Sequence, residues 1–149
     1  MVPDDGKSLR EYTTRTCVDQ GKIKYLEYDD AVAVHHHVVE NSGGAFGVRD
    51  EALLISALQR PKNLTYYDSN ADIFELAATL LTGIAMNHPF LDGNKRCAMM
   101  CALIFLSMNG IKLKTLEISR SSKLIIGVAT HKISDAQVAD FLKKLADSK

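Results

Sequence analysis

The stretch from Ile73 to Asn109 reads IFELAATLLTGIAMNHPFLDGNKRCAMMCALIFLSMN. In its first part, apolar residues recur at spacings of three and four, which places them on one face of an α-helix. These residues are Ile73, Leu76, Ala77, Leu80, Leu81 and Ile84. The second part, Asn94–Asn109, is apolar on nearly all sides, and Gly110 is placed to end it. A helix that is apolar all round is surrounded by other helices, so we expect Asn94–Asn109 to be the central, buried element of the fold.

Further helices are predicted on both sides of this pair. The residues that can cap them are Asp29, Asp50, Ser119 and Ser134. The first helix runs to about Asn41 and ends at Gly43, and the second is short because Pro61 stops it. The last begins with a capping box, since Gln137 follows its capping serine by three residues.

One short segment favours β structure. Lys62–Tyr67 reads KNLTYY, which is β-prone but too short for a core strand, so we expect an exposed hairpin or flap there. Met1–Gly21 lacks a clear period and is predicted to be an N-terminal extension, partly flexible, with a short helix around Leu9–Val18. The sequence therefore predicts a single domain over residues 22–149, an all-α bundle around a central buried helix with one small β-hairpin flap.

Composition excludes several classes of protein. The 149 residues are 46% hydrophobic and 24% charged, as is usual for one globular domain, and 18 Lys and Arg balance 18 Asp and Glu, which argues against direct nucleic-acid binding. The longest apolar run, Cys97–Leu106, is half the roughly 20 residues that a membrane span needs. The charged start has no apolar signal segment, and three cysteines without a CxxC motif favour free thiols. We expect a cytoplasmic protein without membrane contact.

The loop between the two central helices gathers the residue types of a phosphate-transfer site. It stands at a helix N-terminus, where unpaired N–H groups and the helix dipole attract anions, and Lys95 and Arg96 add full positive charges. Gly93 lets the backbone approach a ligand closely. Asp92 is an oxygen ligand suited to a Mg²⁺ ion that rides on phosphates, and His88 can take a proton from a hydroxyl. A loop that merely caps a helix would leave the two cations and the aspartate unexplained.

These nine residues, 88–96, read HPFLDGNKR and resemble the signature of the Fic/Doc family, whose Fic form is HxFx(D/E)GNGRxxR. The resemblance covers about Tyr28–Ala146. Four other segments of this sequence also resemble landmarks of the Doc branch. They are GG at 43–44, GVRDEALL at 47–54, FELAA at 74–78 and FLSMNG at 105–110. Two positions depart from the Fic form, since Lys95 replaces the second motif glycine and Met99 the final arginine. Both departures are typical of the Doc branch.

The resemblance implies an activity. Fic enzymes mostly transfer AMP from ATP to a protein hydroxyl, whereas the Doc branch implies a kinase that places the γ-phosphate of ATP on a Ser or Thr hydroxyl. A translation factor such as elongation factor Tu is the implied target. The implied cofactors are ATP and Mg²⁺, and the implied role is the toxin of a toxin–antitoxin pair. An AMP transferase with the same catalytic residues is the alternative, and a non-catalytic binding module is a third possibility.

The resemblance also implies a role for each motif residue. His88 would deprotonate the target hydroxyl, Asp92 would organise Mg²⁺, and Phe90 would anchor the loop in the core. The phosphate-binding turn would consist of Gly93, Asn94, Lys95 and Arg96. The flap, which would pair with an extended segment of the target, would consist of Leu64, Thr65, Tyr66 and Tyr67.

Self-inhibiting members of the family carry an (S/T)xxxE(G/N) helix, and the nearest match here, Thr16–Gly21, has Gln20 in place of the glutamate. A glutamine lacks the charge to pair with a motif arginine. The resemblance therefore implies a small antitoxin that acts in trans.

Two other groups have simpler interpretations. Consecutive helical residues point about 100° apart, so His35, His36 and His37 cannot converge on one metal ion, and we expect them on a solvated or partly packed helix. Cys97 and Cys101 lie four apart in an apolar helix and are predicted to be core thiols.

Overall fold

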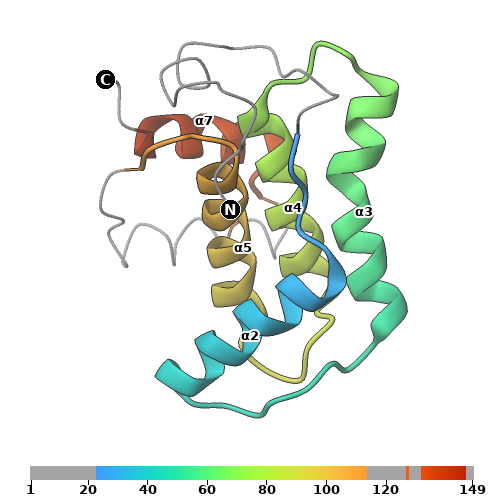
Figure 1. Ribbon diagram of the computed structural model, residues 1–149, viewed down its shortest axis with the longest axis vertical. Helices are drawn as coiled ribbons and strands as arrows, with labels where there is room; N and C mark the ends of the chain where they lie inside the picture. The colour runs from blue at the N-terminus through green and yellow to red at the C-terminus, as the bar shows by residue number, and fades with distance from the viewer. Residues whose placement is uncertain (1–22, 114–126, 128–131, 147–149) are drawn as a thin grey trace.

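Helices make up most of what the computed structural model describes, which is residues 23–113, 127 and 132–146 (Figure 1). Their bounds are α2 Tyr28–Ser42, α3 Glu51–Tyr67, α4 Ile73–Asn87, α5 Asn94–Met108 and α7 Asp135–Leu145. Within those residues, β pairing is limited to two isolated bridges, Val48 with Phe90 and Leu113 with Ala146. The predicted all-α fold is confirmed.

Helix α4 occupies the centre of the bundle. It packs against α3, α5 and α7, and eleven of its fifteen residues are buried, compared with seven of fifteen in α5. Helices α3 and α5 run antiparallel to α4 on either side, and α2 crosses the start of α5 at the opposite end from α7 (Figure 1). The prediction places Asn94–Asn109 at the centre, but the structure places α4 there. Helix α5 is less buried because it begins with polar residues and leaves Met100 exposed.

Gly83 allows α3 to lie close against α4. A Cβ added to Gly83 would be 3.2 Å from both Cα and Cβ of Ala57 and 2.9 Å from Cδ of Arg60. The backbone of a packed helix cannot move aside as the end of a flexible side chain can, so the contact requires a glycine. The same two helices are also linked by a hydrogen bond, which the side chain of Asn87 at the end of α4 donates to Leu53 O of α3 at 3.0 Å.

We expect Gly83→Val to lower the free energy of unfolding by about 1–3 kcal/mol, because the added methyl groups overpack the α3–α4 contact. Urea unfolding measures the change. Met86→Val is the matched control, since it places the same β-branched residue on the same helix at a position that is 37% exposed. A Gly83→Val protein as stable as the control would show that the two helices are not held this closely.

The predicted hairpin at Lys62–Tyr67 is wrong, because these residues form the last turns of α3. Pro61 does not stop the helix; it is buried within it. Contacts from outside the helix hold this end: Tyr25 OH lies 3.2 Å from Thr65 Oγ1, and Lys62 Nζ lies 3.3 Å from a carboxylate oxygen of Glu27. These tertiary contacts override the weak β preference of the segment.

The role proposed for the flap residues fails with the hairpin. Strand-to-strand docking needs an extended backbone with free hydrogen-bonding groups, and a helix offers none. Tyr66 and Tyr67 are 88% and 84% exposed and form an edge-to-face pair. A helix rises about 1.5 Å per residue, so these tyrosines lie roughly 20 Å along α3 from its first turn. Leu64 and Thr65 are only partly exposed in the same turn.

The capping predictions are largely confirmed. Asp50 Oδ1 accepts from Leu53 N at the start of α3, and Ser134 and Gln137 form the predicted capping box of α7. Helix α2 begins two residues earlier than predicted, since Glu27 and not Asp29 is its N-cap. The helix predicted from Ser119 onward and the N-terminal extension lie outside the described residues, as does the Thr16–Gly21 match.

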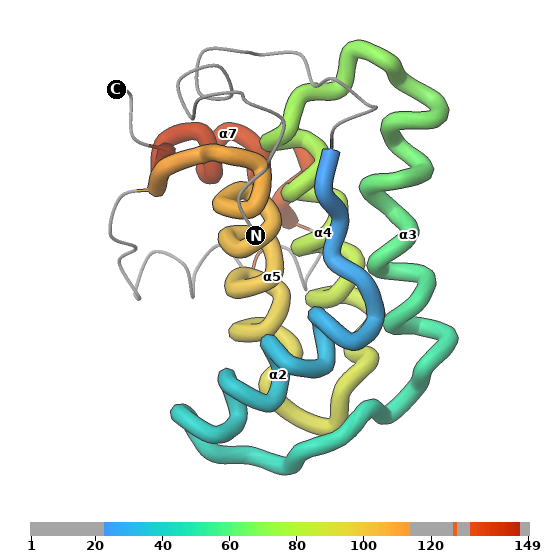
Figure 2. Tube along the Cα trace, viewed as in Figure 1, coloured from blue at the N-terminus to red at the C-terminus, as the bar shows by residue number. Residues whose placement is uncertain are grey.

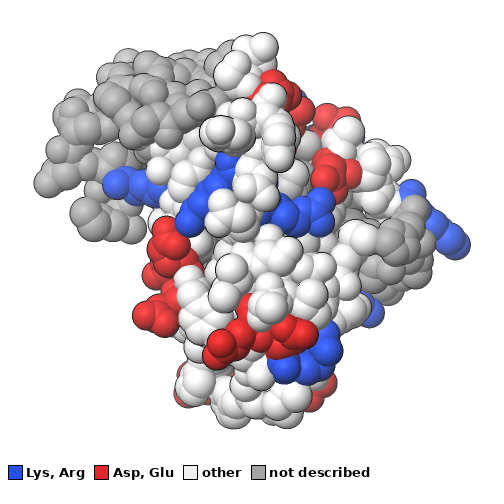
Figure 3. Space-filling view, turned by 90° about the vertical axis from the view of Figure 1, so that its right-hand side faces the viewer, with Lys and Arg blue, Asp and Glu red and all other residues white. Residues whose placement is uncertain are grey.

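Residues 23–27 lie along the bundle before α2 begins (Figure 2). The side chain of Asn109, at the end of α5, accepts from Lys24 N and donates to Lys24 O, both at 2.9 Å. On the face shown in Figure 3, acidic and basic side chains of the described residues are interspersed. Among the described helices, none has the length and apolar character needed to cross a membrane.

Candidate functional site

His88 lies where α4 ends. Its backbone is left-handed, with φ 49° and ψ 55°, a conformation that residues other than glycine adopt rarely. It is the C-cap residue of the helix, and its N–H donates to Ile84 O at 3.2 Å. The side chain is exposed. The left-handed residue turns the chain out of the helix and leaves the imidazole at the surface.

Phe90 anchors the loop two residues later. It is 1% exposed, and its ring stacks on that of His35 with centroids 3.9 Å apart and planes 5° from parallel. Phe90 N donates to Asn94 Oδ1 at 2.9 Å, while Asn94 Nδ2 donates to Phe90 O at 3.0 Å. The stacked ring and the two backbone bonds fix the middle of the loop.

Asp92 is held from two directions. His35 Nε2 lies 2.6 Å from Asp92 O, and Asp92 Oδ2 accepts from Ala45 N at 2.9 Å. Gly44 makes this approach possible, since a Cβ there would lie 3.1 Å from Cβ of Asp92, and its φ of +114° suits glycine. Asp92 Oδ1 has no hydrogen-bond partner among the described residues, and the side chain is exposed. The carboxylate therefore has a fixed direction, and one of its oxygens has no partner among the residues that the structure describes.

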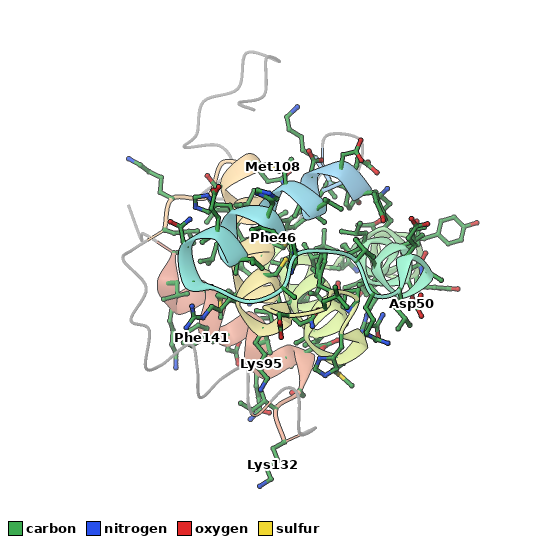
Figure 4. The ribbon with its side chains drawn as sticks, turned by 90° about the horizontal axis from the view of Figure 1, so that it is seen from below. Phe46, Asp50, Lys95, Met108, Lys132 and Phe141 are labelled. Carbon is green, nitrogen blue, oxygen red and sulfur yellow. The ribbon has the colours of Figure 1, made fainter. Side chains whose placement is uncertain are left out.

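The turn after Asp92 opens α5. Gly93 is the N-cap with φ 74°, and a Cβ there would face Val39, Val38 and His35 at 3.5–3.8 Å. Glycine has no side chain to cap the first N–H groups of the helix, which stay available to an anion. Lys95 and Arg96 are exposed in this turn. In the view of this end from below, Lys95 projects away from Phe46 (Figure 4).

The arrangement fits Mg²⁺ bound together with phosphates better than a metal bound by protein alone. Within the described part of the chain, no three His, Cys, Asp or Glu side chains come close enough to hold a metal ion. Mg²⁺ commonly takes one or two carboxylates and completes its shell with water and phosphate oxygens. Asp92 Oδ1, which has no partner in the described part of the chain, precedes the N-terminus of α5 and is compatible with that kind of site.

The structure brings the motif residues into one loop and adds others that sequence reasoning missed. The sequence predicts no role at the site for His35, yet this residue is 2% exposed and contacts both Phe90 and Asp92. Its spacing of three and four from Val38 and Val39, which are also buried, is the signal that could have placed it on the inner face of α2. Asn94, which is predicted to line the phosphate-binding turn, also uses its side chain to hold the loop.

The structure also shows where the consecutive histidines and the two cysteines of α5 lie. His36 and His37 are exposed, so the three histidines do not converge, and His36 packs on Phe46 with centroids 4.5 Å apart. Cys97 and Cys101 are buried, with sulfur atoms 3.8 Å apart. The hydrogen bond between the two thiols, together with burial, raises the pKa of Cys101 well above its usual range. The predicted core thiols are confirmed.

Comparison with known proteins assigns this architecture. The model of the Fic/DOC family matches residues 25–106, which include α2 to α4, the whole loop and most of α5. The chain belongs to the Fic/Doc family. Among curated relatives of this Fic/Doc chain, "Protein kinase doc" of Escherichia phage P1 is 32% identical over 126 residues, 85% of this chain and 98% of that protein. "Toxin Doc" of Mycolicibacterium smegmatis is 40% identical over 109 residues, 72% of this chain and 82% of that protein.

Family membership confirms what the loop suggested about the class of protein. The Fic/Doc match contains the signature at 88–96, the whole of α4 and most of α5. The chain is thus an enzyme-type Fic/Doc domain in which the histidine, the aspartate and the Gly-Asn pair of the signature are all present.

Proposed function

We propose that this Fic/Doc chain is a Doc-like toxin that transfers the γ-phosphate of ATP to a Ser or Thr hydroxyl of a target protein, such as a translation factor. His88 takes the hydroxyl proton, and Asp92 binds Mg²⁺. The N-terminus of α5, with Gly93, Lys95 and Arg96, binds phosphate oxygens. ATP supplies the phosphoryl group, and Mg²⁺ neutralises the charge that develops during its transfer.

The observation that carries the proposal is the geometry of the loop. The base candidate is exposed at the end of α4, and the carboxylate and the two cations are exposed at the start of α5. Phosphoryl transfer depends mainly on positioning and on electrostatic stabilisation, so a rigid loop with these groups at one surface is suited to it. A pure binding module needs no exposed base beside a phosphate-binding turn.

Lys95 favours phosphate over AMP as the transferred group. A glycine at this position leaves the first turn of the helix bare, so that the outer phosphates of ATP can settle there and the α-phosphate faces the hydroxyl. An exposed lysine occupies part of that space and binds phosphates elsewhere. The similarity to a protein named as a kinase supports the same choice. The AMP transferase is the alternative function, because it would use the same histidine and aspartate.

Labelled ATP tests the choice. Label from γ-labelled ATP should appear on the target protein, whereas label from α-labelled ATP should not, because only the phosphorus aligned with the hydroxyl reacts at a useful rate. Host-cell extract and purified elongation factor Tu serve as substrates, and mass spectrometry should show an added phosphate.

Two variants sharpen this test. Lys95→Gly should lose γ-transfer, while Lys144→Ala, which removes an exposed charge on α7, should keep it. Transfer of the α-label by the unmodified chain would replace the kinase proposal with AMP transfer. If neither the α-label nor the γ-label appears on any protein, the result would favour a non-catalytic binding module.

Regulation by a small antitoxin in trans is part of the proposal. Its support is the similarity to a protein named Toxin Doc, together with the harm that an unrestrained kinase of this kind would cause its host. A short reading frame beside the gene, whose product binds the purified chain and stops γ-transfer, is the expected finding. A product that binds without any effect on transfer would contradict it.

A further inference from the structure

Arg49, which lies outside the signature, binds the backbone around His88. Arg49 Nε donates to His88 O at 2.8 Å, and Arg49 Nη2 donates to Asn87 O at 3.0 Å. Its own backbone N–H donates to Pro89 O at 2.7 Å. One residue thus occupies the three consecutive carbonyl groups that surround the candidate base.

These bonds meet two needs of the chain at this point. The last carbonyl groups of α4 have no partner within the helix, and a cation at a helix C-terminus is favoured by the helix dipole. His88 also holds a left-handed backbone, which persists in a residue other than glycine only when the surroundings enforce it. The guanidinium fork fixes the carbonyl on each side of the His88 Cα, so it restrains the torsions there.

Arg49 is itself held in place from both sides. On one side, Leu91 N donates to Gly47 O at 3.0 Å, which forms part of the bridge between Val48 and Phe90. On the other side, the N-cap residue of α3, Asp50, donates its backbone N–H to Pro89 O at 3.1 Å. The backbone of Arg49 therefore has a fixed position, although its side chain is exposed.

We infer that Arg49 is a positioning residue, which holds His88 in the left-handed conformation that aims its imidazole at the reacting hydroxyl. The catalytic effect of Arg49 rests on the proposed function. Its effect on the backbone conformation of His88 is independent of that function, so conformation and catalysis are measured in separate experiments.

The experiment compares Arg49→Ala, Arg49→Lys and the matched control Lys144→Ala in the full-length protein. In isotope-labelled protein, the Cα shift and the amide coupling constant of His88 report its φ. Arg49→Ala should move both values away from the left-handed range, Arg49→Lys should recover part of the change, and Lys144→Ala should leave them unaltered. If Arg49→Ala does not fold, as judged by circular dichroism, Arg49→Gln replaces it.

Kinetics form the second readout. Arg49→Ala should lower kcat for γ-transfer by about 10²-fold, the effect of a small misplacement of a catalytic group, and leave KM for ATP nearly unchanged. An unaltered His88 backbone in Arg49→Ala would overturn the inference, even if activity fell, because Arg49 would then act on the substrate directly. If the unmodified chain transfers no phosphate, the backbone measurement still decides the positioning effect, and only the proposed function fails.

Discussion

His88→Ala is expected to lower phosphate transfer by about 10²–10⁴-fold, the usual contribution of a general base. The imidazole is exposed at the end of α4, so its removal deletes the proposed base and leaves the core untouched. In cells, expression of the unmodified chain without an antitoxin should stop growth, and His88→Ala should restore it. Growth curves at equal soluble protein levels measure this effect.

His37→Ala is the matched control for that experiment. His37 is also exposed, but it lies on α2 and its recorded hydrogen-bond partner is Asn41 of the same helix. The control should remain toxic and active. Equal toxicity of His88→Ala and the unmodified chain would remove His88 from the mechanism, since a base that contributes so much cannot be lost without effect.

Phe90→Ala should lower the free energy of unfolding by about 3–5 kcal/mol, as is typical when a buried phenylalanine is truncated. The ring is almost fully buried and lies flat on His35, so its removal leaves a cavity between α2 and the loop. A domain of this size is typically stable by only ~5–15 kcal/mol, so the loss threatens folding. Denaturant unfolding followed by circular dichroism measures it.

Leu91→Ala separates the effect of the core from that of the loop. Leu91 is the next residue, but it is 53% exposed, so its truncation should cost much less than that of Phe90. A cost under ~1 kcal/mol for Phe90→Ala would mean that the ring does not hold the loop in the core.

The parts of the fold that local sequence controls could be predicted. The apolar spacing of α4, the cap at Asp50 and the capping box at Ser134 each depend on residues within one or two turns. The end of α3 could not be predicted, because contacts from Tyr25 and Glu27, about 40 residues earlier in the chain, stabilise it as a helix. Local β preference was outweighed there by tertiary contacts.

The same distinction applies to the site. His88, Asp92 and Gly93 could be found because they stand within six residues of one another in a recognisable loop. The residues that hold the loop come from far away in the chain: His35 bonds to Asp92 across 57 positions, and Arg49 bonds to His88 across 39. No spacing rule links such pairs, so only the folded chain reveals them.

The packing of α7 on α4 affects when the core can be completed during synthesis of the chain. Domains tend to fold as units as they emerge from the ribosome, N-terminal parts first. Helix α7 is the last helix described, and its buried side chains, Val138, Ala139, Leu142 and Leu145, cover the central helix that leads into His88. The core around α4 therefore stays incomplete until the residues of α7 have been made. The loop at residues 88–96 is thus translated before the helix that completes the packing behind it.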